Sequence, residues 1–263
     1  MSTVKPEYPD CLSVVIPVYN EEASLAEVVR KLLSLPHLLE VIIVDDCSTD
    51  RSAEVAREMS KAEPRVRLAQ QKKNSGKTAA LRLGFSLTQG DIVIVQDADL
   101  EYDPEEIPLV IRPILEGHAD VCFGSRFLVR RATRVLYFYH YVANKFLTFT
   151  SNLFTNLNMT DIETGYKAFR GDIIRNMVIV SSGFGFEVEA TAKVAKLGCP
   201  IYEVPISYYG RTYEEGKKIG VRDGLLALWL IFRFNLFCPL SSAYRELPAA
   251  RVPGAHQIVD TNV

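Results

Sequence analysis

Between residues 12 and 124, short apolar runs alternate with amphipathic stretches, and this alternation constrains the fold more than any other feature. The apolar runs are LSVVIPV, VIIVDD, RVRLAQ and DIVIVQDAD, separated by stretches of helical periodicity near 21–35, 51–63 and 76–88. Strands joined by crossover helices form parallel sheets. The runs VIIV and IVIV are apolar at successive positions, as expected of strands covered on both faces. The sequence therefore predicts an α/β fold, Rossmann-like, with a mostly parallel central sheet flanked by helices.

The pattern changes after residue 124. An aromatic-rich segment near 130–158 is typical of one or two helices that begin with basic residues, and an apolar helix is predicted over 222–237. The final stretch has little apolar periodicity, so we expect it to be loosely ordered. The expected organisation is an N-terminal tail over 1–9, one domain over 10–238 and a loosely ordered tail over 239–263.

Composition and charge narrow the function classes. With 263 residues, 48% hydrophobic and 24% charged, the chain has ordinary globular usage. Its 30 basic and 32 acidic residues give a formal charge of -2, so no overall field attracts nucleic acid, and we expect no nucleic-acid partner. The five scattered cysteines include no C-x-x-C pair, which argues against a zinc site or a disulfide framework. The N-terminal residues carry no signal pattern, so a cytoplasmic location is expected.

Two segments bear on membrane contact. The most apolar run, 225–237, is shorter than the roughly 20 residues that a membrane span needs, and it contains Arg233. The aromatic segment 135–154 follows Arg130, Arg131 and Arg134, as in a helix that lies in a membrane interface. A core helix or a dimer-packing helix would show a similar stripe. The sequence leaves these readings open.

Polar residues follow three of the predicted strands, at the sheet edge where ligands of such folds bind. Asp97 and Asp99 come directly after DIVIVQ, and two such carboxylates suit Mg²⁺, which takes one or two carboxylates plus phosphate oxygens. A solvated turn is the alternative. After the second strand, Asp45 suits hydrogen bonds to a ribose or base, whereas Ser48 is explained as a helix cap.

Basic residues near the same edge could bind phosphate. The run Asn74-Ser-Gly-Lys-Thr resembles the end of a P-loop but lacks its first glycine, since position 71 is Gln71. Lys77 could still place its ammonium near a phosphate, or simply begin a helix. Arg126 ends a further strand, and Arg211 and Lys217 lie in the loop RTYEEGKK; such cations bind phosphates well, although a solvated charged loop is the alternative.

These motifs occur together in a recognisable order. With P-V-Y-N-E, D-D-C-S-T-D, N-S-G-K-T-A-A, D-A-D-L, G-S-R and R-T-Y-E-E-G-K-K, the chain resembles inverting family-2 glycosyltransferases of the GT-A fold over about residues 10–235. The nearest resemblance is to polyprenyl-phosphate hexosyltransferases. The run TDIETGYKAFR at 160–170 and the RTYEEGKK loop are similar to those of the dolichyl-phosphate mannose and glucose synthases.

The resemblance implies roles for particular residues. It implies Mg²⁺ or Mn²⁺ as the cofactor. The implied metal ligands are Asp97, Asp99 and Glu101. The implied nucleotide-sugar contacts are Pro17, Tyr19, Glu21, Asp45, Lys77, Asp97, Ala98 and Asp99. The residues expected to act in catalysis, by holding phosphates or moving a proton, are Asp99, Arg126, Asp161, Arg211 and Lys217.

The resemblance also implies a reaction. A nucleotide-diphosphate sugar of the UDP-glucose or GDP-mannose type would donate its hexose, in one inverting displacement, to a polyprenyl phosphate. That acceptor is already anionic near neutral pH, so it needs little general-base help. Attachment would be peripheral, on the cytoplasmic membrane surface, with a homodimer as a further expectation. A hydroxyl acceptor would instead need a base, such as Asp161, Glu187 or Glu189. A catalytically silent nucleotide-sugar-binding subunit is the other alternative.

Overall fold

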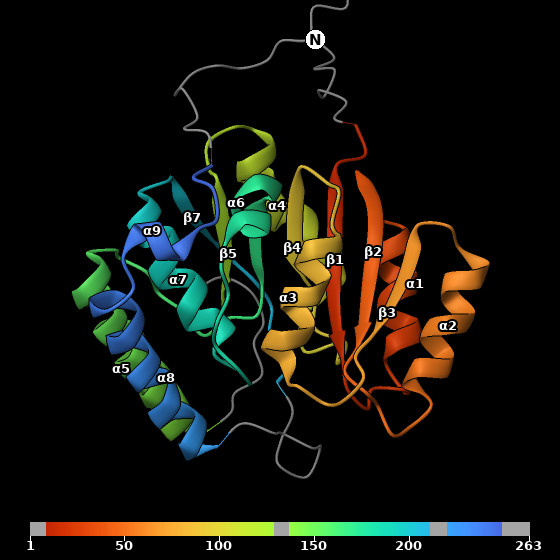
Figure 1. The fold of residues 1–263 in the computed structure, drawn as a ribbon, viewed down its shortest axis with the longest axis horizontal. Helices are drawn as coiled ribbons and strands as arrows, with labels where there is room; N and C mark the ends of the chain where they lie inside the picture. Colours follow the sequence, from red (N-terminus) through yellow and green to blue (C-terminus); the bar gives the residue numbers. More distant parts are fainter. Residues whose placement is uncertain (1–8, 129–136, 211–219, 249–263) are drawn as a thin grey trace, which may run out of the picture.

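A mixed sheet forms the centre of the protein (Figure 1). The computed structural model describes residues 9–128, 137–210 and 220–248. Seven strands follow the order β3-β2-β1-β4-β6-β5-β7, and β6 alone runs antiparallel to its neighbours β4 and β5. The strands are β1 (Leu12–Val18), β2 (Leu38–Asp45), β3 (Val66–Gln70), β4 (Ile92–Val95), β5 (Val121–Ser125), β6 (Lys167–Arg170) and β7 (Ile201–Pro205).

Helices cover both faces of this sheet (Figure 1). They are α1 (Leu25–Leu33), α2 (Ser52–Ala62), α3 (Lys77–Leu87), α4 (Ile107–Leu115), α5 (Phe138–Thr155), α6 (Gly171–Asn176), α7 (Phe186–Leu197), α8 (Val221–Leu236) and α9 (Leu240–Ala243), with a 3₁₀ turn over Pro104–Glu106. The predicted α/β class with a mostly parallel sheet is confirmed.

Strand β1 shows why its sequence is apolar at successive positions. Val15 belongs to the hydrophobic cluster on the face that α3 and α7 cover, whereas Val14 and Ile16 belong to the cluster on the face of α1 and α4. All three side chains have no exposed surface. A strand covered on both faces cannot alternate apolar with polar residues.

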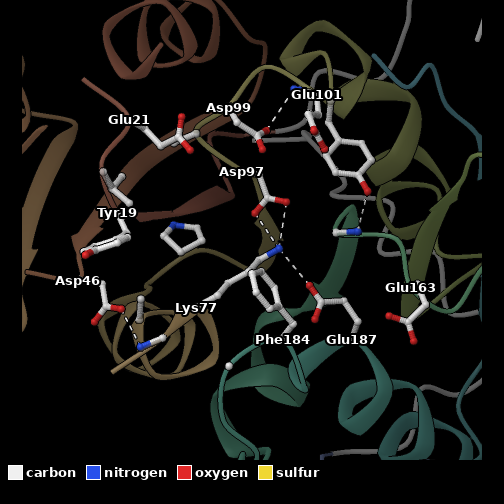
Figure 2. Close-up of a pocket in the computed structure, with 18 of the residues that line it drawn as sticks. Tyr19, Glu21, Asp46, Lys77, Asp97, Asp99, Glu101, Glu163, Phe184 and Glu187 are labelled. Carbon is white, nitrogen blue, oxygen red and sulfur yellow. Dashed lines mark hydrogen bonds and ion pairs between the residues drawn. The ribbon is translucent and has the colours of Figure 1, made fainter. Parts of the chain in front are cut away.

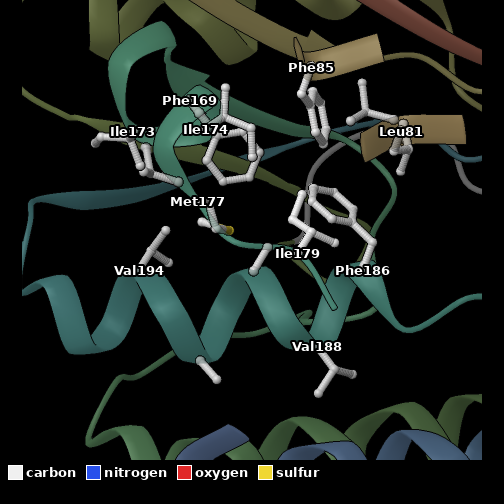
Figure 3. Close-up of a cluster of buried hydrophobic side chains, with 14 of the residues drawn as sticks. Leu81, Phe85, Phe169, Ile173, Ile174, Met177, Ile179, Phe186, Val188 and Val194 are labelled. Atoms are coloured by element: carbon white, nitrogen blue, oxygen red, sulfur yellow. The ribbon is translucent and has the colours of Figure 1, made fainter. Parts of the chain in front are cut away.

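One cluster fixes α7 relative to α3 (Figure 3). Phe85 of α3 and Phe186 of α7 lie with ring centroids 5.3 Å apart, and Phe169 of β6 packs edge-on against Phe186 at 6.2 Å. The amide of Phe186, the first residue of α7, also donates a 3.1 Å hydrogen bond to the Thr78 hydroxyl, which brings the N-terminal turn of α7 to the N-terminal turn of α3. Two charged residues of the site, Lys77 and Glu187, lie in those turns.

Helix α3 also lies unusually close to the sheet. At Gly84, an added Cβ would come 2.3 Å from Cγ1 of Val15 and 3.2 Å from Cγ2 of Val44. Only the lack of a side chain permits this approach, which sets the height of α3 above β1 and β2.

The C-terminal part contains two helices that pack together. Helices α5 and α8 lie side by side in Figure 1, and the rings of Phe154 and Phe232 meet at 5.2 Å. The expectation of a loosely ordered tail from residue 239 is wrong for its first ten residues. Helix α9 lies there, Tyr244 is 4% exposed, and Tyr244 forms a β-bridge with Met177. The apolar side chains Ala243 and Tyr244 anchor this segment although it shows no periodicity.

Candidate active site

A cavity of about 370 Å³ opens at the carboxyl ends of β1, β2 and β4 (Figure 2). Parallel strands deliver their following residues to one edge of a sheet, so residues distant in sequence meet there. Of the expected site residues, the cavity is lined by Pro17, Tyr19, Glu21, Lys77, Asp97, Ala98, Asp99, Glu101 and Arg126. The sheet thus gathers most of the predicted set in one place.

Lys77 is held between two carboxylates. Its Nζ lies 2.8 Å from Oδ1 and 3.0 Å from Oδ2 of Asp97, and 3.0 Å from Oε1 of Glu187. Burial lowers the pKa of Lys77, but the two carboxylates outweigh this effect and hold the pKa well above its usual range. The ammonium is therefore permanently charged, and it ties Asp97, after β4, to Glu187 of α7.

Asp97 experiences opposing influences. Burial raises its pKa to about 6; the Lys77 ammonium opposes this rise, and repulsion from Asp99 and Glu187 adds to it. A cation added beside Asp97 and Asp99 would relieve that repulsion. The two carboxylates also supply the hard oxygen ligands that Mg²⁺ and Mn²⁺ take together with phosphate oxygens. The residues present therefore fit a divalent cation.

Glu101 is less well placed for that cation than the sequence implied. Within the described ranges, no three His, Cys, Asp or Glu side chains converge closely enough to hold a metal ion. Leu100 adopts a left-handed conformation, with φ of 59°, and the Glu101 amide donates to Oδ1 of Asp99 at 3.1 Å. The Glu101 carboxylate instead accepts a 2.9 Å hydrogen bond from the Tyr208 hydroxyl. The expected three-ligand set is thus not assembled, and two carboxylates remain.

Arg126 and Asp161 form a buried ion pair. The guanidinium donates two hydrogen bonds of 2.7 Å to the two oxygens of Asp161, and the Arg126 amide donates a third at 3.1 Å. Burial alone would raise the pKa of Asp161, but Arg126 holds it below its usual range. Asp161 has no exposed surface and does not line the cavity. Its position suits orienting Arg126 and does not suit the general-base role considered for it.

At the second strand end the cavity is lined by Asp46 and not by Asp45. Asp46 accepts hydrogen bonds from the amides of Ser75 and Gly76, at 2.8 and 2.7 Å, and so fixes the turn before α3. Gly76 needs to be glycine there, since its φ is 86°. Asp45 is 2% exposed and accepts from the Ser48 amide at 3.3 Å.

Other expected residues lie elsewhere. Arg211 and Lys217 lie outside the described residues. Glu189 is fully buried, pairs with Lys193 and accepts from the amides of Val180 and Ser181, so it stabilises the loop before α7 and does not line the cavity.

Sequence reasoning missed Glu163 as a site residue. It lines the cavity, and its Oε1 is shielded from solvent and has no hydrogen-bond partner in the described part of the chain. Burial, with repulsion from Glu187 next in size, raises the pKa of Glu163 to about 7. The residue lies in the TDIETGY run, within the motif at 160–170. Phe184, Tyr102 and Tyr208 also line the cavity, and no sequence pattern singles them out.

Solved structures support the same fold. Glucosyl-3-phosphoglycerate synthase from Mycobacterium tuberculosis, in complex with Mn²⁺, uridine diphosphate and phosphoglyceric acid, matches with a TM-score of 0.66 and 20% identity, over 86% of this chain and 78% of that one. The complex of that enzyme with Mn²⁺ and UDP-glucose also gives a TM-score of 0.66, at 18% identity, over 86% and 79% of the two chains. The chain therefore has the fold of these structures.

The sequence places the chain more narrowly. Residues 13–178 match the family described as glycosyl transferase family 2, and the chain belongs to that family. It is 31% identical to an undecaprenyl-phosphate mannosyltransferase of Micrococcus luteus, over 84% of this chain and 97% of the relative.

Longer relatives match as well. The chain is 30% identical to a dolichol-phosphate mannosyltransferase of Pyrococcus furiosus, over 80% of this chain and 59% of the relative. An undecaprenyl-phosphate 4-deoxy-4-formamido-L-arabinose transferase of Pseudomonas aeruginosa is 32% identical over 83% of this chain and 63% of its own length. The chain therefore spans about three fifths of these two proteins. In the described part of the chain, no helix has the length and apolar character needed to span a bilayer.

Proposed function

We propose that this glycosyltransferase transfers a hexose from a nucleotide-diphosphate sugar to a polyprenyl phosphate, with inversion at the anomeric carbon. The observation that carries the proposal is the match to an undecaprenyl-phosphate mannosyltransferase over 97% of that relative's length, together with a cavity that gathers carboxylates and cations at one sheet edge. The donor is of the UDP-glucose or GDP-mannose type.

The donor would lie along the strand ends. Pro17, Tyr19 and Asp46 line the part of the cavity beside β1 and β2, where nucleosides bind in such sheets. Asp45 precedes Asp46 in the chain. It accepts a hydrogen bond from the Ser48 amide, which supports the turn after β2. The diphosphate would then reach Asp97 and Asp99 at the end of β4.

Asp97 and Asp99 would hold Mg²⁺ or Mn²⁺. A divalent cation supplies Lewis-acid stabilisation of the negative charge that develops on a departing diphosphate. Lys77 holds Asp97 in place and brings a fixed positive charge to the same end of the cavity. The Glu101 carboxylate would act by holding the Tyr208 side chain in place, since it accepts a hydrogen bond from the Tyr208 hydroxyl.

The acceptor phosphate needs cations that overcome its repulsion by the donor. Arg126 is one, since Asp161 fixes its guanidinium while Arg126 itself lines the cavity. Arg211 and Lys217 are proposed to contribute two more. A lipid monophosphate is anionic near pH 7, so Asp161 need not act as a base.

The acceptor also implies a membrane surface. Helices α5 and α8 carry large hydrophobic side chains that are at least two fifths exposed, including Tyr139 at 83% and Phe138 at 69%. The others on these two helices are Tyr141, Val142, Phe146, Phe149, Leu153, Leu225, Leu226, Trp229 and Leu236. Such a face fits the headgroup region of a bilayer. Peripheral attachment, on the cytoplasmic side, follows as a proposal.

Flotation with anionic liposomes tests the attachment. Phe146→Ser with Phe149→Ser should abolish co-flotation at low salt, and Val180→Ser, which removes an exposed valine outside these helices, should leave it unchanged. Two results together would indicate that the face forms a homodimer instead. The wild-type protein would stay at the bottom of the gradient, and it would form a dimer that the double variant does not form.

The reaction itself is tested by label transfer. The protein is incubated with Mg²⁺ or Mn²⁺, a short polyprenyl phosphate and radiolabelled UDP-glucose, GDP-mannose or related donors, and label is extracted into organic solvent. Label from one donor, lost in Asp99→Asn, is expected. Absence of lipid label, with metal-dependent nucleotide binding intact, would favour the silent binding subunit or a hydroxyl acceptor.

A further inference from the structure

One end of the cavity carries two carboxyl groups that the proposed displacement does not use, Glu163 and Glu187. Glu187 is 5% exposed; its Oε1 binds Lys77, whereas its Oε2 is shielded from solvent and has no partner among the described residues. Oε1 of Glu163 is shielded and unpartnered in the same way. Buried polar atoms without partners destabilise a fold, so two of them in one cavity indicate a ligand that binds there.

The order of residues along the cavity indicates which part of a ligand arrives at this end. In Figure 2, Tyr19 and Asp46 lie on one side, Asp97 with Lys77 lies in the middle, and Glu163 lies on the far side next to Glu187. If the proposed function is right, the nucleoside lies near Asp46 and the diphosphate near Asp97. The sugar, which follows the diphosphate, then extends toward Glu163 and Glu187.

We propose that Glu163, with Glu187 beside it, recognises the hydroxyl groups of the donor's hexose, and that this pair favours a neutral sugar over a hexuronic acid. The inference rests on the proposed function and deepens it. A sugar hydroxyl both donates and accepts hydrogen bonds, so it can satisfy a carboxyl group in either protonation state. A sugar carboxylate would instead meet Glu187, whose charge is held next to Lys77.

Two properties of Glu163 favour this role. The side chain keeps part of its surface open to the cavity, and the terminal torsion of a glutamate turns readily, so either oxygen can face a ligand. The carboxyl is also only partly ionised near neutrality. Burial raises its pKa to about 7; Glu187 and Asp161 add to the rise, while Arg126 and Lys167 oppose it.

The experiment compares binding of a nucleotide sugar with binding of its nucleoside diphosphate. Calorimetric titrations with UDP, UDP-glucose, GDP and GDP-mannose, in Mn²⁺, separate the contribution of the sugar from that of the nucleotide. The variants are Glu163→Gln, which keeps the size and both hydrogen-bonding capacities, and Glu163→Met, which keeps only the size. Glu58→Met, on the exposed face of α2, is the matched control.

For the donor that binds, Glu163→Met should bind the nucleotide sugar about 10- to 100-fold more weakly and the nucleoside diphosphate within about twofold of wild type. Glu163→Gln and Glu58→Met should both stay within about threefold. Deoxy analogues of the donor should bind to wild type more weakly than the parent donor does. For one of these analogues, the affinities of analogue and parent should be equal in Glu163→Met. UDP-glucuronate should bind wild type more weakly than UDP-glucose if the uridine donor is used.

Two results would overturn the inference alone. Unchanged nucleotide-sugar affinity in Glu163→Met would show that the sugar does not meet this residue. Equal weakening of nucleotide sugar and nucleoside diphosphate would show that Glu163 only supports the cavity wall. Failure of wild type to bind any of the four nucleotides would instead overturn the proposed function, and the inference with it.

Discussion

Replacing Glu163 by Gln should stabilise the protein at high pH and not at low pH. In the unfolded chain the carboxyl titrates near its ordinary pKa of 4.5, whereas in the folded protein burial and Glu187 raise the pKa to about 7. Between these values the folded state holds a proton that the unfolded state has lost. The free energy of unfolding therefore falls as pH rises from about 4.5 to about 7, and it stays lowered above that range.

The size of the effect follows from the two pKa values. A shift of about 2.5 units, at 1.36 kcal/mol per unit, corresponds to about 3 kcal/mol. Glutamine cannot ionise, so Glu163→Gln lacks this loss. The unfolding free energy of the variant minus that of wild type should thus increase by about 3 kcal/mol from pH 4 to pH 8.

Urea unfolding followed by circular dichroism at several pH values measures this difference. Glu58→Gln, exposed on α2, serves as the control and should show no such trend. A difference between Glu163→Gln and wild type that stays constant from pH 4 to pH 8 would refute the reasoning, because it would mean that Glu163 ionises in the folded protein as it does in the unfolded chain.

Three further perturbations follow from the structure. Arg126→Met should lower the unfolding free energy by about 3–5 kcal/mol, because it leaves the Asp161 carboxylate buried without its partner; urea unfolding measures this, and a loss below about 1 kcal/mol would contradict it. Gly84→Ala should lower the unfolding free energy by about 1–3 kcal/mol, because the added methyl group clashes with Val15. Gly224→Ala, which has open space in α8, should be neutral or stabilising by up to about 1 kcal/mol. A higher melting temperature for Gly84→Ala than for Gly224→Ala would be inconsistent with the packing of α3. Chelation with EDTA should abolish transfer, and Mg²⁺ or Mn²⁺ should restore it; full activity in EDTA would exclude the proposed metal.

The sequence predicts those parts of the fold in which the pattern of apolar residues reflects which faces of a strand are buried. The runs VIIV in β2 and IVIV in β4 are apolar at every position because both faces of those strands are covered, so the parallel sheet follows from the pattern. The polar residues after β1, β2 and β4 meet because parallel strands end at one edge. Strand β6 is different: four residues carry no sign of direction, and its antiparallel position between β4 and β5 depends on tertiary packing.

Individual site residues are harder to predict, because carboxylates that are neighbours in sequence differ only in where the folded backbone directs their side chains. Asp45 and Asp46 read alike in sequence, yet the backbone turn after β2 leaves Asp46 in the cavity. Asp161 and Glu163 lie two residues apart, and Asp161 is withdrawn from the cavity because Arg126 binds both its oxygens. Such choices depend on partners that arrive from distant segments, and spacing along the chain does not specify them.

The most direct test of the account compares two acceptors of equal length, a short polyprenyl monophosphate and the corresponding polyprenol. Both are offered with the same labelled donor and Mn²⁺, and the products are extracted and identified by mass spectrometry. The account predicts a sugar phosphodiester from the monophosphate and no glycoside from the alcohol. Transfer to the alcohol, with none to the monophosphate, would contradict it and would require a general base that the Arg126–Asp161 pair does not provide.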